Sequence, residues 1–348
     1  MTDDTAPIRS GEEIPTGSLA AWLASTGAAH PSGREWETLH IQQFPAGHSN
    51  LTYLLRTVAG EYVLRRPPLG PVAPKAHDMV REARVLQAVH PHFPPAPQIV
   101  AVCEDPAVIG TPFFVMERRY GVVVRRGMPA EYAGTAGAAG RISQALIDGL
   151  ADLHRIDVQR TGLVALGKPE GFLERQVSGW TDRWYRARTT PSPGMDRVVA
   201  WLAAERPESA RTTIVHNDYK LDNVMLAADD PGRLVAVLDW EMATVGDPMA
   251  DLGLTLTYWS LPEARAVAGM SDREGWWSRD RMLERYAERT GSRLEALPWH
   301  EVLGIFKLAV IVQQIYARYV RGQTSDPRFR EMGRMVEALV AAAVRRLP

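Results

Sequence analysis

The chain has 348 residues, 45% of them hydrophobic, and a formal net charge of −1. This predicts a large folded core, divided between two domains, and argues against nucleic acid as the main partner. Cys103 is the only cysteine, which excludes an internal disulfide and a cysteine metal cluster. The polar N-terminus lacks the features of a signal peptide, and Lys307, Gln313 and Gln314 interrupt the longest apolar run. We therefore expect a cytoplasmic protein with no membrane partner.

The first part of the chain alternates between apolar and polar residues in short runs, as strands do. The pattern predicts a short helix at 18–24, five strands, at 38–44, 51–57, 61–66, 98–104 and 112–118, and a longer helix at 74–89. The strands and the longer helix amount to a five-stranded sheet with one helix.

The turn between the first two strands and the basic end of the third are typical of a nucleotide-binding lid. Small polar groups in the turn, here Ser49 and Asn50, can approach phosphates, and a cation on the third strand, Arg65, can pair with them. Glu82, in the helix, suits an ion pair that positions this cation. Taken singly, the turn could be a plain hairpin loop and Glu82 an ordinary solvated side chain.

The stretch Met116-Glu117-Arg118-Arg119, at the end of the fifth strand, is expected to connect two domains, residues 1–118 and 119–348. It includes Met116 and Arg118, which we expect beside the adenine of a bound nucleotide. Such a connector binds through backbone N–H and C=O groups, so its side-chain identities carry little information. From residue 140 onward the pattern is mainly helical, with helices around 142–153, 172–184, 195–205, 248–258, 280–289, 300–321 and 327–346.

A predicted β-hairpin interrupts this helical half. Its strands are the short apolar runs 224–226 and 234–238, separated by the turn signal Asp-Asp-Pro-Gly at 229–232. The open end of a hairpin brings its first and last residues together. Asn223, before the first strand, and Asp239, after the second, are therefore expected to lie side by side.

These residues, with Asp218 on the preceding loop, are the groups that phosphoryl transfer requires. A carboxylate such as Asp218 takes up the proton of an attacking hydroxyl, while Asn223 and Asp239 can hold Mg²⁺ against the nucleotide phosphates. A buried hairpin with polar turn residues is the simpler alternative, but the combined spacing favours chemistry. For His216 alone we expect a structural role, bracing the backbone of the loop.

The stretches His216–Asn223 and Leu238–Glu241 resemble the catalytic and metal-binding motifs of the aminoglycoside phosphotransferase family, which includes choline kinases. The resemblance extends over nearly the whole chain, and it adds the turn at 47–52, the strand at 62–65 and Arg81-Glu82. It implies an α+β, protein-kinase-like fold of two lobes, with a small N-terminal antiparallel sheet lobe and a large, mainly helical C-terminal lobe. It also implies ATP and Mg²⁺ as cofactors.

Four further stretches, at 153–157, 171–177, 246–252 and 316–322, resemble a narrower branch, the phosphotransferase domains fused to acyl-CoA dehydrogenases. That branch implies phosphorylation of a small-molecule hydroxyl, such as that of a hydroxyacyl-CoA. Two residues depart from the wider pattern. Asn217 stands where much of the family has glycine, and Arg65 replaces the lysine of protein kinases, although its planar fork can still reach two phosphate oxygens.

We therefore expect a small-molecule kinase, monomeric or homodimeric, with a neutral or anionic acceptor. Residues 252–348 carry 15 basic against 11 acidic side chains, the wrong sign for a polycation. Four aromatic residues could cover an apolar part of the acceptor, although core packing explains them equally well: Tyr258, Trp259, Trp276 and Trp277. The alternatives are an aminoglycoside O-phosphotransferase and a non-catalytic nucleotide-binding regulatory protein. Protein kinase activity is disfavoured because Asp239 is followed too soon by the next helix for a normal activation segment.

Overall fold

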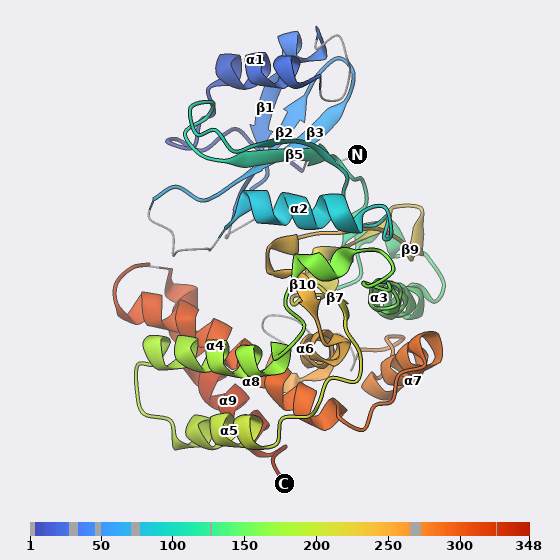
Figure 1. Ribbon diagram of the computed structural model, residues 1–348, viewed down its shortest axis with the longest axis vertical. Coiled ribbons are helices and arrows are strands. Elements are labelled where there is room, and N and C mark those ends of the chain that lie inside the picture. The colour runs from blue at the N-terminus through green and yellow to red at the C-terminus, as the bar shows by residue number, and fades with distance from the viewer. Residues whose placement is uncertain are drawn as a thin grey trace. The chain divides into compact units, whose positions relative to one another are not determined.

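The structure, a computed structural model, describes residues 4–27, 34–45, 50–70, 77–125, 127–264, 273–324 and 326–348. The chain forms two compact units, drawn with their elements labelled in Figure 1. Unit 1 comprises Met1–Tyr120 and Ala236–Glu241, and unit 2 comprises Gly121–Val235 and Met242–Pro348. The sequence predicts a single boundary after residue 118, and nothing in it indicates that a six-residue segment returns to the first unit.

Unit 1 is built on the predicted five-stranded antiparallel sheet, with strand order β1-β2-β3-β5-β4. The strands are β1 (His40–Gln43), β2 (Leu51–Arg56), β3 (Glu61–Arg66), β4 (Ile99–Cys103) and β5 (Phe113–Glu117). The helices of this unit are α1 (Thr16–Thr26) and α2 (Met79–Val89). The predicted start of α2 at residue 74 falls outside the described residues, and the helix as described begins after its N-cap, Asp78.

Successive side chains of a strand point to opposite faces of the sheet, and this alternation divides β3 between two environments. Leu64 packs with Leu19 and Leu23 of α1 in a buried apolar cluster. The preceding and following residues, Val63 and Arg65, therefore point to the other face, where Arg65 meets α2. One basic side chain is thus placed against a helix rather than in the apolar core.

Unit 2 is mainly helical. Its helices are α3 (Ala138–His154), α4 (Phe172–Ala187), α5 (Pro193–Ala204), α6 (Pro248–Ser260), α7 (Arg279–Thr290), α8 (Leu297–Val320) and α9 (Met332–Val344). Its short strands are β6 (Val122–Val123), β7 (Thr213–Val215), β8 (Val224–Ala227) and β10 (Thr244–Gly246). β9 (Asp230–Val237) begins in unit 2 and ends in unit 1. The helical content agrees with the sequence expectation, and with unit 1 it confirms the α+β class.

Helices α6 and α8 form the centre of unit 2, and glycine allows them to approach closely. A Cβ atom added at Gly253 of α6 would lie 2.4 Å from the carbonyl oxygen of His300, and one at Gly304 would lie 2.7 Å from the carbonyl oxygen of Gly253. Among the described residues, α8 alone is long and apolar enough to cross a membrane, but 67% of its apolar window is buried inside the protein. That burial is typical of a core helix.

The hairpin differs from its prediction in the position of the turn. The turn is Ala228-Asp229, and β9 already begins at Asp230, so Pro231 and Gly232 belong to the strand. Because β9 lies at the edge of the order β6-β8-β9, a proline that lacks an N–H can be accommodated in it. The Asp-Pro-Gly signal therefore marked the start of an edge strand rather than the turn itself.

Candidate active site

The loop that follows β7 carries the predicted base, and one buried carboxylate accepts hydrogen bonds from its backbone. The backbone N–H groups of His216 and Asn217 donate to the two oxygens of Asp251, at 2.5 and 2.6 Å. Asp251 lies in the first turn of α6 and is fully buried. Burial raises its pKa, but His154, 3.3 Å away, and the nearby His216 and Lys307 outweigh burial and hold the pKa below its ordinary value. The ionised carboxylate thus fixes the loop.

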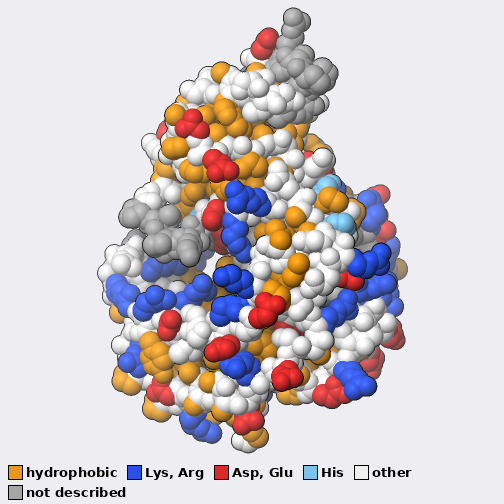
Figure 2. All heavy atoms as spheres, viewed as in Figure 1, with side chains coloured by type: hydrophobic (Ala, Val, Ile, Leu, Met, Phe, Trp, Pro, Cys, Tyr) orange, Lys and Arg blue, Asp and Glu red, His pale blue; other side chains and the backbone are white. Residues whose placement is uncertain are grey.

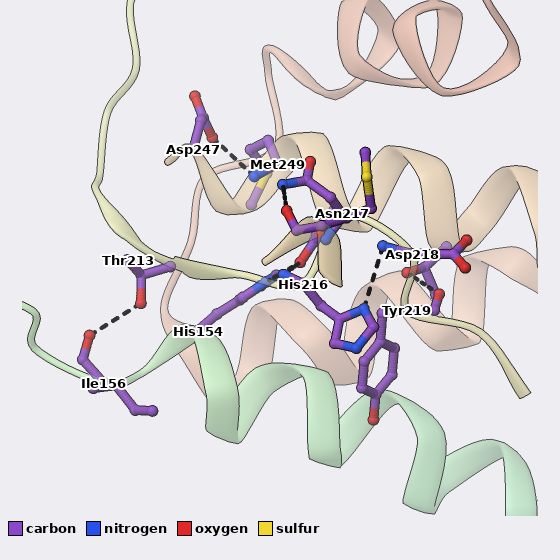
Figure 3. Close-up of polar contacts among 12 residues, drawn as sticks. His154, Ile156, Thr213, His216, Asn217, Asp218, Tyr219, Asp247 and Met249 are labelled. Atoms are coloured by element: carbon purple, nitrogen blue, oxygen red, sulfur yellow. Dashed lines mark hydrogen bonds and ion pairs between the residues drawn. The ribbon is translucent and has the colours of Figure 1, made fainter. Parts of the chain in front are cut away.

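Asn217 and His216 shape the loop further (Figure 3). Asn217 has φ of 64°, in the left-handed region that glycine and asparagine adopt most readily. This explains how asparagine can occupy a position where much of the family has glycine. Its side chain donates to the carbonyl oxygen of Met242 and accepts from Lys307 Nζ at 3.2 Å. His216 Nδ1 accepts from the backbone N–H of Asp218 at 3.3 Å, which is the expected bracing role.

Asp218 is held by three side chains. Lys220 Nζ donates to both of its oxygens, at 2.8 and 2.7 Å. Asn223 Nδ2 donates to its Oδ2 at 2.9 Å, and the hydroxyl of Tyr258 donates to its Oδ1 at 3.1 Å. The pKa of Tyr258 is raised well above its ordinary value, by burial and then by the charge of Asp218, so Tyr258 stays protonated and remains a donor. The carboxylate is therefore oriented while its side chain remains 23% exposed.

Unit 1 carries a second polar cluster, centred on Arg65. Its Nη1 lies 3.0 Å from Glu82 Oε1, and its Nη2 lies 2.7 Å from Asp239 Oδ1. Asp239 belongs to the six-residue segment of unit 1 and has φ of 65°. In the same segment, Glu241 accepts a hydrogen bond from Asn50 Nδ2 at 3.0 Å. Four of the predicted nucleotide and metal residues thus meet in this unit, around one guanidinium.

The charges of this cluster shift the pKa values of its own groups. Burial disfavours the charged form of Arg65, but Glu82 and Asp239 outweigh burial and hold the pKa of Arg65 above its ordinary value. Burial raises the pKa of Glu82 to about 7, with Asp239 and Glu241 adding to the increase and Arg65 opposing it. Three carboxylates share the cluster with Arg65 and with two more basic side chains, His77, 3.3 Å from Glu241, and Arg81. The buried Asn50 Oδ1 and Glu82 Oε2 have no hydrogen-bond partner. This environment suits a divalent cation and a polar ligand.

The remaining predicted residues lie in different places. Ser49 falls outside the described residues. Met116 is a buried residue of β5. Arg118 forms ion pairs with Glu61 and Asp4 and stacks on the ring of Tyr120 at 4.9 Å. Its side chain therefore has a structural role, while the expectation for both residues concerned backbone groups. Asp218 and Asn223 belong to unit 2, and Asp239 belongs to unit 1.

Sequence analysis did not identify four residues that organise these clusters. They are Lys220, Glu241, Asp251 and Lys307. Lys220 and Glu241 stand inside the quoted motifs, and Asp251 stands inside the stretch 246–252. The signal for Lys307 was a lone lysine within an apolar helix. The aromatic residues considered for the acceptor pocket have different roles. Tyr258 donates a hydrogen bond to the proposed base, Asp218. Trp259 and Trp277 are buried and joined by a hydrogen bond, as core packing predicts.

Two features define a kinase-like phosphotransferase. One is a carboxylate on a loop whose backbone is fixed by an aspartate of α6, and the other is an arginine–glutamate ion pair beside a small antiparallel sheet. The sequence profile of the Phosphotransferase enzyme family matches residues 40–299. The chain belongs to this family.

Relatives and solved structures agree with this assignment. Mouse "Acyl-CoA dehydrogenase family member 10" is 31% identical over 347 residues, covering 98% of this chain and 32% of that protein. The chain spans about a third to under half of the length of the curated relatives that it matches. These matches confirm the narrower branch expected from the sequence.

The crystal structure of a "putative aminoglycoside phosphotransferase" from Ralstonia eutropha JMP134 has 30% identity and a TM-score of 0.81, covering 96% of this chain and 98% of that chain. A mutant of the aminoglycoside phosphotransferase APH(4)-Ia, in a ternary complex with ADP and hygromycin B, has 16% identity and a TM-score of 0.60, with coverage of 94% and 98%. The second likeness is one of fold alone. Together they confirm the kinase-like fold class.

Proposed function

We propose that the chain transfers the γ-phosphate of ATP, with Mg²⁺, to a hydroxyl of a small anionic metabolite such as a hydroxyacyl-CoA. The observation that carries the proposal is that Lys220, Asn223 and Tyr258 all donate hydrogen bonds to the carboxylate of Asp218. A carboxylate that is fixed by three donors and still partly exposed is suited to accept a proton from a bound alcohol.

The proposed step conserves atoms and charge. The acceptor oxygen attacks the γ-phosphorus, its proton passes to Asp218, the bond to the β-phosphate oxygen breaks, and ADP leaves. Lys220 places a positive charge 2.7 Å from the base, where it can stabilise negative charge on the phosphoryl group. Arg65, oriented by Glu82 at 3.0 Å, is the proposed phosphate-binding cation.

The residues present fit a magnesium ion. Asp239 offers a carboxylate within the unit 1 cluster, and Asn223 of unit 2 offers an amide oxygen, since its NH₂ group is engaged by Asp218. Both are hard oxygen donors, and Mg²⁺ usually needs few protein ligands because it keeps water and phosphate oxygens. When bound, the ion neutralises charge on the nucleotide phosphates. Proteins with the same fold have been solved with ADP and with GDP, which supports a purine nucleotide.

The class of acceptor is proposed from charge and from the relatives. The excess of basic residues in 252–348 favours an anionic acceptor over a polycation. The names of the curated relatives, which include acyl-CoA dehydrogenases, support an acyl-CoA derivative. The name of the Ralstonia protein favours the second candidate, an aminoglycoside acceptor.

The test is a kinase assay with Mg²⁺-ATP against hydroxyacyl-CoAs, free hydroxy acids and aminoglycosides, using the wild type and Asp218→Asn. We expect turnover of an anionic compound, and a loss of roughly 10²–10⁴-fold in the variant with nucleotide binding retained. Near-normal turnover by Asp218→Asn would show that Asp218 is not the base. Efficient turnover of an aminoglycoside alone would favour the second candidate. Nucleotide binding without any turnover would favour a regulatory protein.

A further inference from the structure

Helix α4 carries an arginine whose charge is not balanced by a carboxylate. Arg183 is half-buried, with its guanidinium carbon 4.4 Å from the centre of the Trp180 ring. Within the described part of unit 2, no Asp or Glu forms an ion pair with it. Many arginines of the same unit do have such partners: Arg141, Arg279, Arg285, Arg289 and Arg345.

Arg183 belongs to a group that we call the α4–α8 basic cluster, defined as Arg183, Arg186 and Lys307. Lys307 Nζ lies 5.5 Å from the centre of the same Trp180 ring, so it and the Arg183 guanidinium are within about 10 Å of each other. Arg321 Nη2 donates to the carbonyl oxygen of Arg186 at 3.0 Å, which joins the ends of the two helices. Figure 2 shows Lys and Arg side chains gathered on the side of unit 2 where Figure 1 has α4.

Helix dipoles explain only part of this cluster. Arg186 lies at the C-terminal end of α4, where the helix dipole stabilises positive charge. Lys307 lies in the middle of α8, and Arg183 lies one turn before the end of α4, where the effect of the dipole has decreased. Burial and then Arg186 lower the pKa of Arg183, and burial lowers the pKa of Lys307 to about 8. Keeping these two side chains charged therefore lowers the stability of the folded state.

The cluster is connected to the proposed base. Lys307 donates to Asn217 Oδ1 at 3.2 Å, and Asn217 immediately precedes Asp218 in the loop. All of these residues belong to unit 2. A continuous set of contacts thus leads from the loop that carries Asp218, through Lys307, to the Trp180 ring and Arg183.

We propose that Arg183 binds the anionic group of the acceptor, with Lys307 and Arg186 adding positive potential. The inference rests on the proposed phosphotransfer and adds the place where the acceptor is recognised. A guanidinium that stacks on an indole keeps its N–H donors in the plane, where they form a fork for a carboxylate or a phosphate. The anion can come from the carboxylate of a free hydroxy acid or from the phosphates of coenzyme A.

Binding, measured by isothermal titration calorimetry, tests the proposal without requiring turnover. The probes are 3-hydroxybutyrate and coenzyme A, and the variants are Arg183→Gln and Arg183→Lys. Arg281→Gln is the matched control, because Arg281 stacks on Trp277 at 4.3 Å but belongs to α7. Thermal unfolding checks that each variant is folded.

We expect Arg183→Gln to weaken binding of at least one probe about 10- to 100-fold, as loss of a charged hydrogen bond does. Arg183→Lys should recover part of the affinity, and Arg281→Gln should bind like the wild type. A loss for 3-hydroxybutyrate alone identifies a carboxylate site, and a loss for coenzyme A alone identifies a phosphate site. The proposal is wrong if the wild type binds neither probe, or if Arg183→Gln and Arg281→Gln behave alike. Coenzyme A carries no hydroxyacyl group, so Asp218→Asn should keep its affinity for this probe, and binding and phosphotransfer can fail independently.

Discussion

The buried ammonium group of Lys307 should make the stability of the protein depend on alkaline pH. Lys307 is 1% exposed, and burial lowers its pKa from 10.5 to about 8, with Arg183 adding to the decrease and Asp251 and Asp218 opposing it. Because the folded pKa lies below the unfolded pKa, the unfolded chain binds more protons between these two values. The free energy of unfolding therefore rises with pH across this window, and the full cost is present below pH 8.

The size of the effect follows from the two pKa values. The charged lysine costs the folded state about 3 kcal/mol at pH 7, and this falls to about 1 kcal/mol at pH 10. Lys307→Met removes the charge and keeps an apolar side chain of similar length. It also removes the hydrogen bond to Asn217 Oδ1, and this loss lowers the free energy of unfolding of the variant by the same amount at both pH values.

Urea unfolding of the wild type and Lys307→Met at pH 7 and pH 10 measures the effect. We expect the stability of the variant relative to the wild type to be about 2 kcal/mol more favourable at pH 7 than at pH 10. Lys168→Met, at an exposed lysine, is the matched control. An equal stability difference at both pH values, or one that changes in the opposite direction, would refute the reasoning.

Three further substitutions test other parts of the structure. Asp239→Ala should abolish the Mg²⁺-dependent thermal shift given by ATP, because the cluster loses a carboxylate; an unchanged shift would make Asp239 structural. Asn217→Ala should lower the free energy of unfolding by about 2 kcal/mol, because alanine disfavours the left-handed backbone and the side-chain hydrogen bonds are lost. Asn217→Gly should lower it by less, because glycine adopts this backbone without strain, and equal losses in the two variants would show that backbone strain plays no part. Gly253→Ala should cost about 3 kcal/mol, because its Cβ would lie 2.4 Å from the His300 carbonyl oxygen. Gly179→Ala, with no atom within 4 Å of its Cβ, should be neutral or stabilising, and similar losses in both variants would contradict the close-packing argument.

Local patterns in the sequence predicted most of the elements, because strand and helix periodicities are local. The run predicted as a strand at 51–57 is β2 (Leu51–Arg56), and the pairing of Arg65 with Glu82 was expected from a basic strand followed by a helix glutamate. The error in the hairpin turn arose because Pro231 lies in an edge strand, an environment that the sequence does not reveal.

The residues that sequence reasoning missed act over long separations. Asp251 binds the loop from 35 residues away, and Lys307 reaches Asn217 from 90 residues away. Neither contact has a local signature, since each depends on how α6 and α8 pack. The lone lysine in an apolar helix could have been recognised as unusual, but only the folded arrangement shows what it contacts.

The assignment of Ala236–Glu241 to unit 1 has a consequence for biosynthesis. Residues 1–120 emerge from the ribosome well before the segment that supplies Asp239 to Arg65 and packs Trp240 against Phe93. At typical rates of synthesis, the more than one hundred intervening residues take on the order of ten seconds to be made. Throughout that interval the guanidinium of Arg65 lacks one of its two carboxylates, and Phe93 lacks its aromatic neighbour. The nascent N-terminal sheet therefore stays an incomplete unit until the middle of unit 2 has been translated.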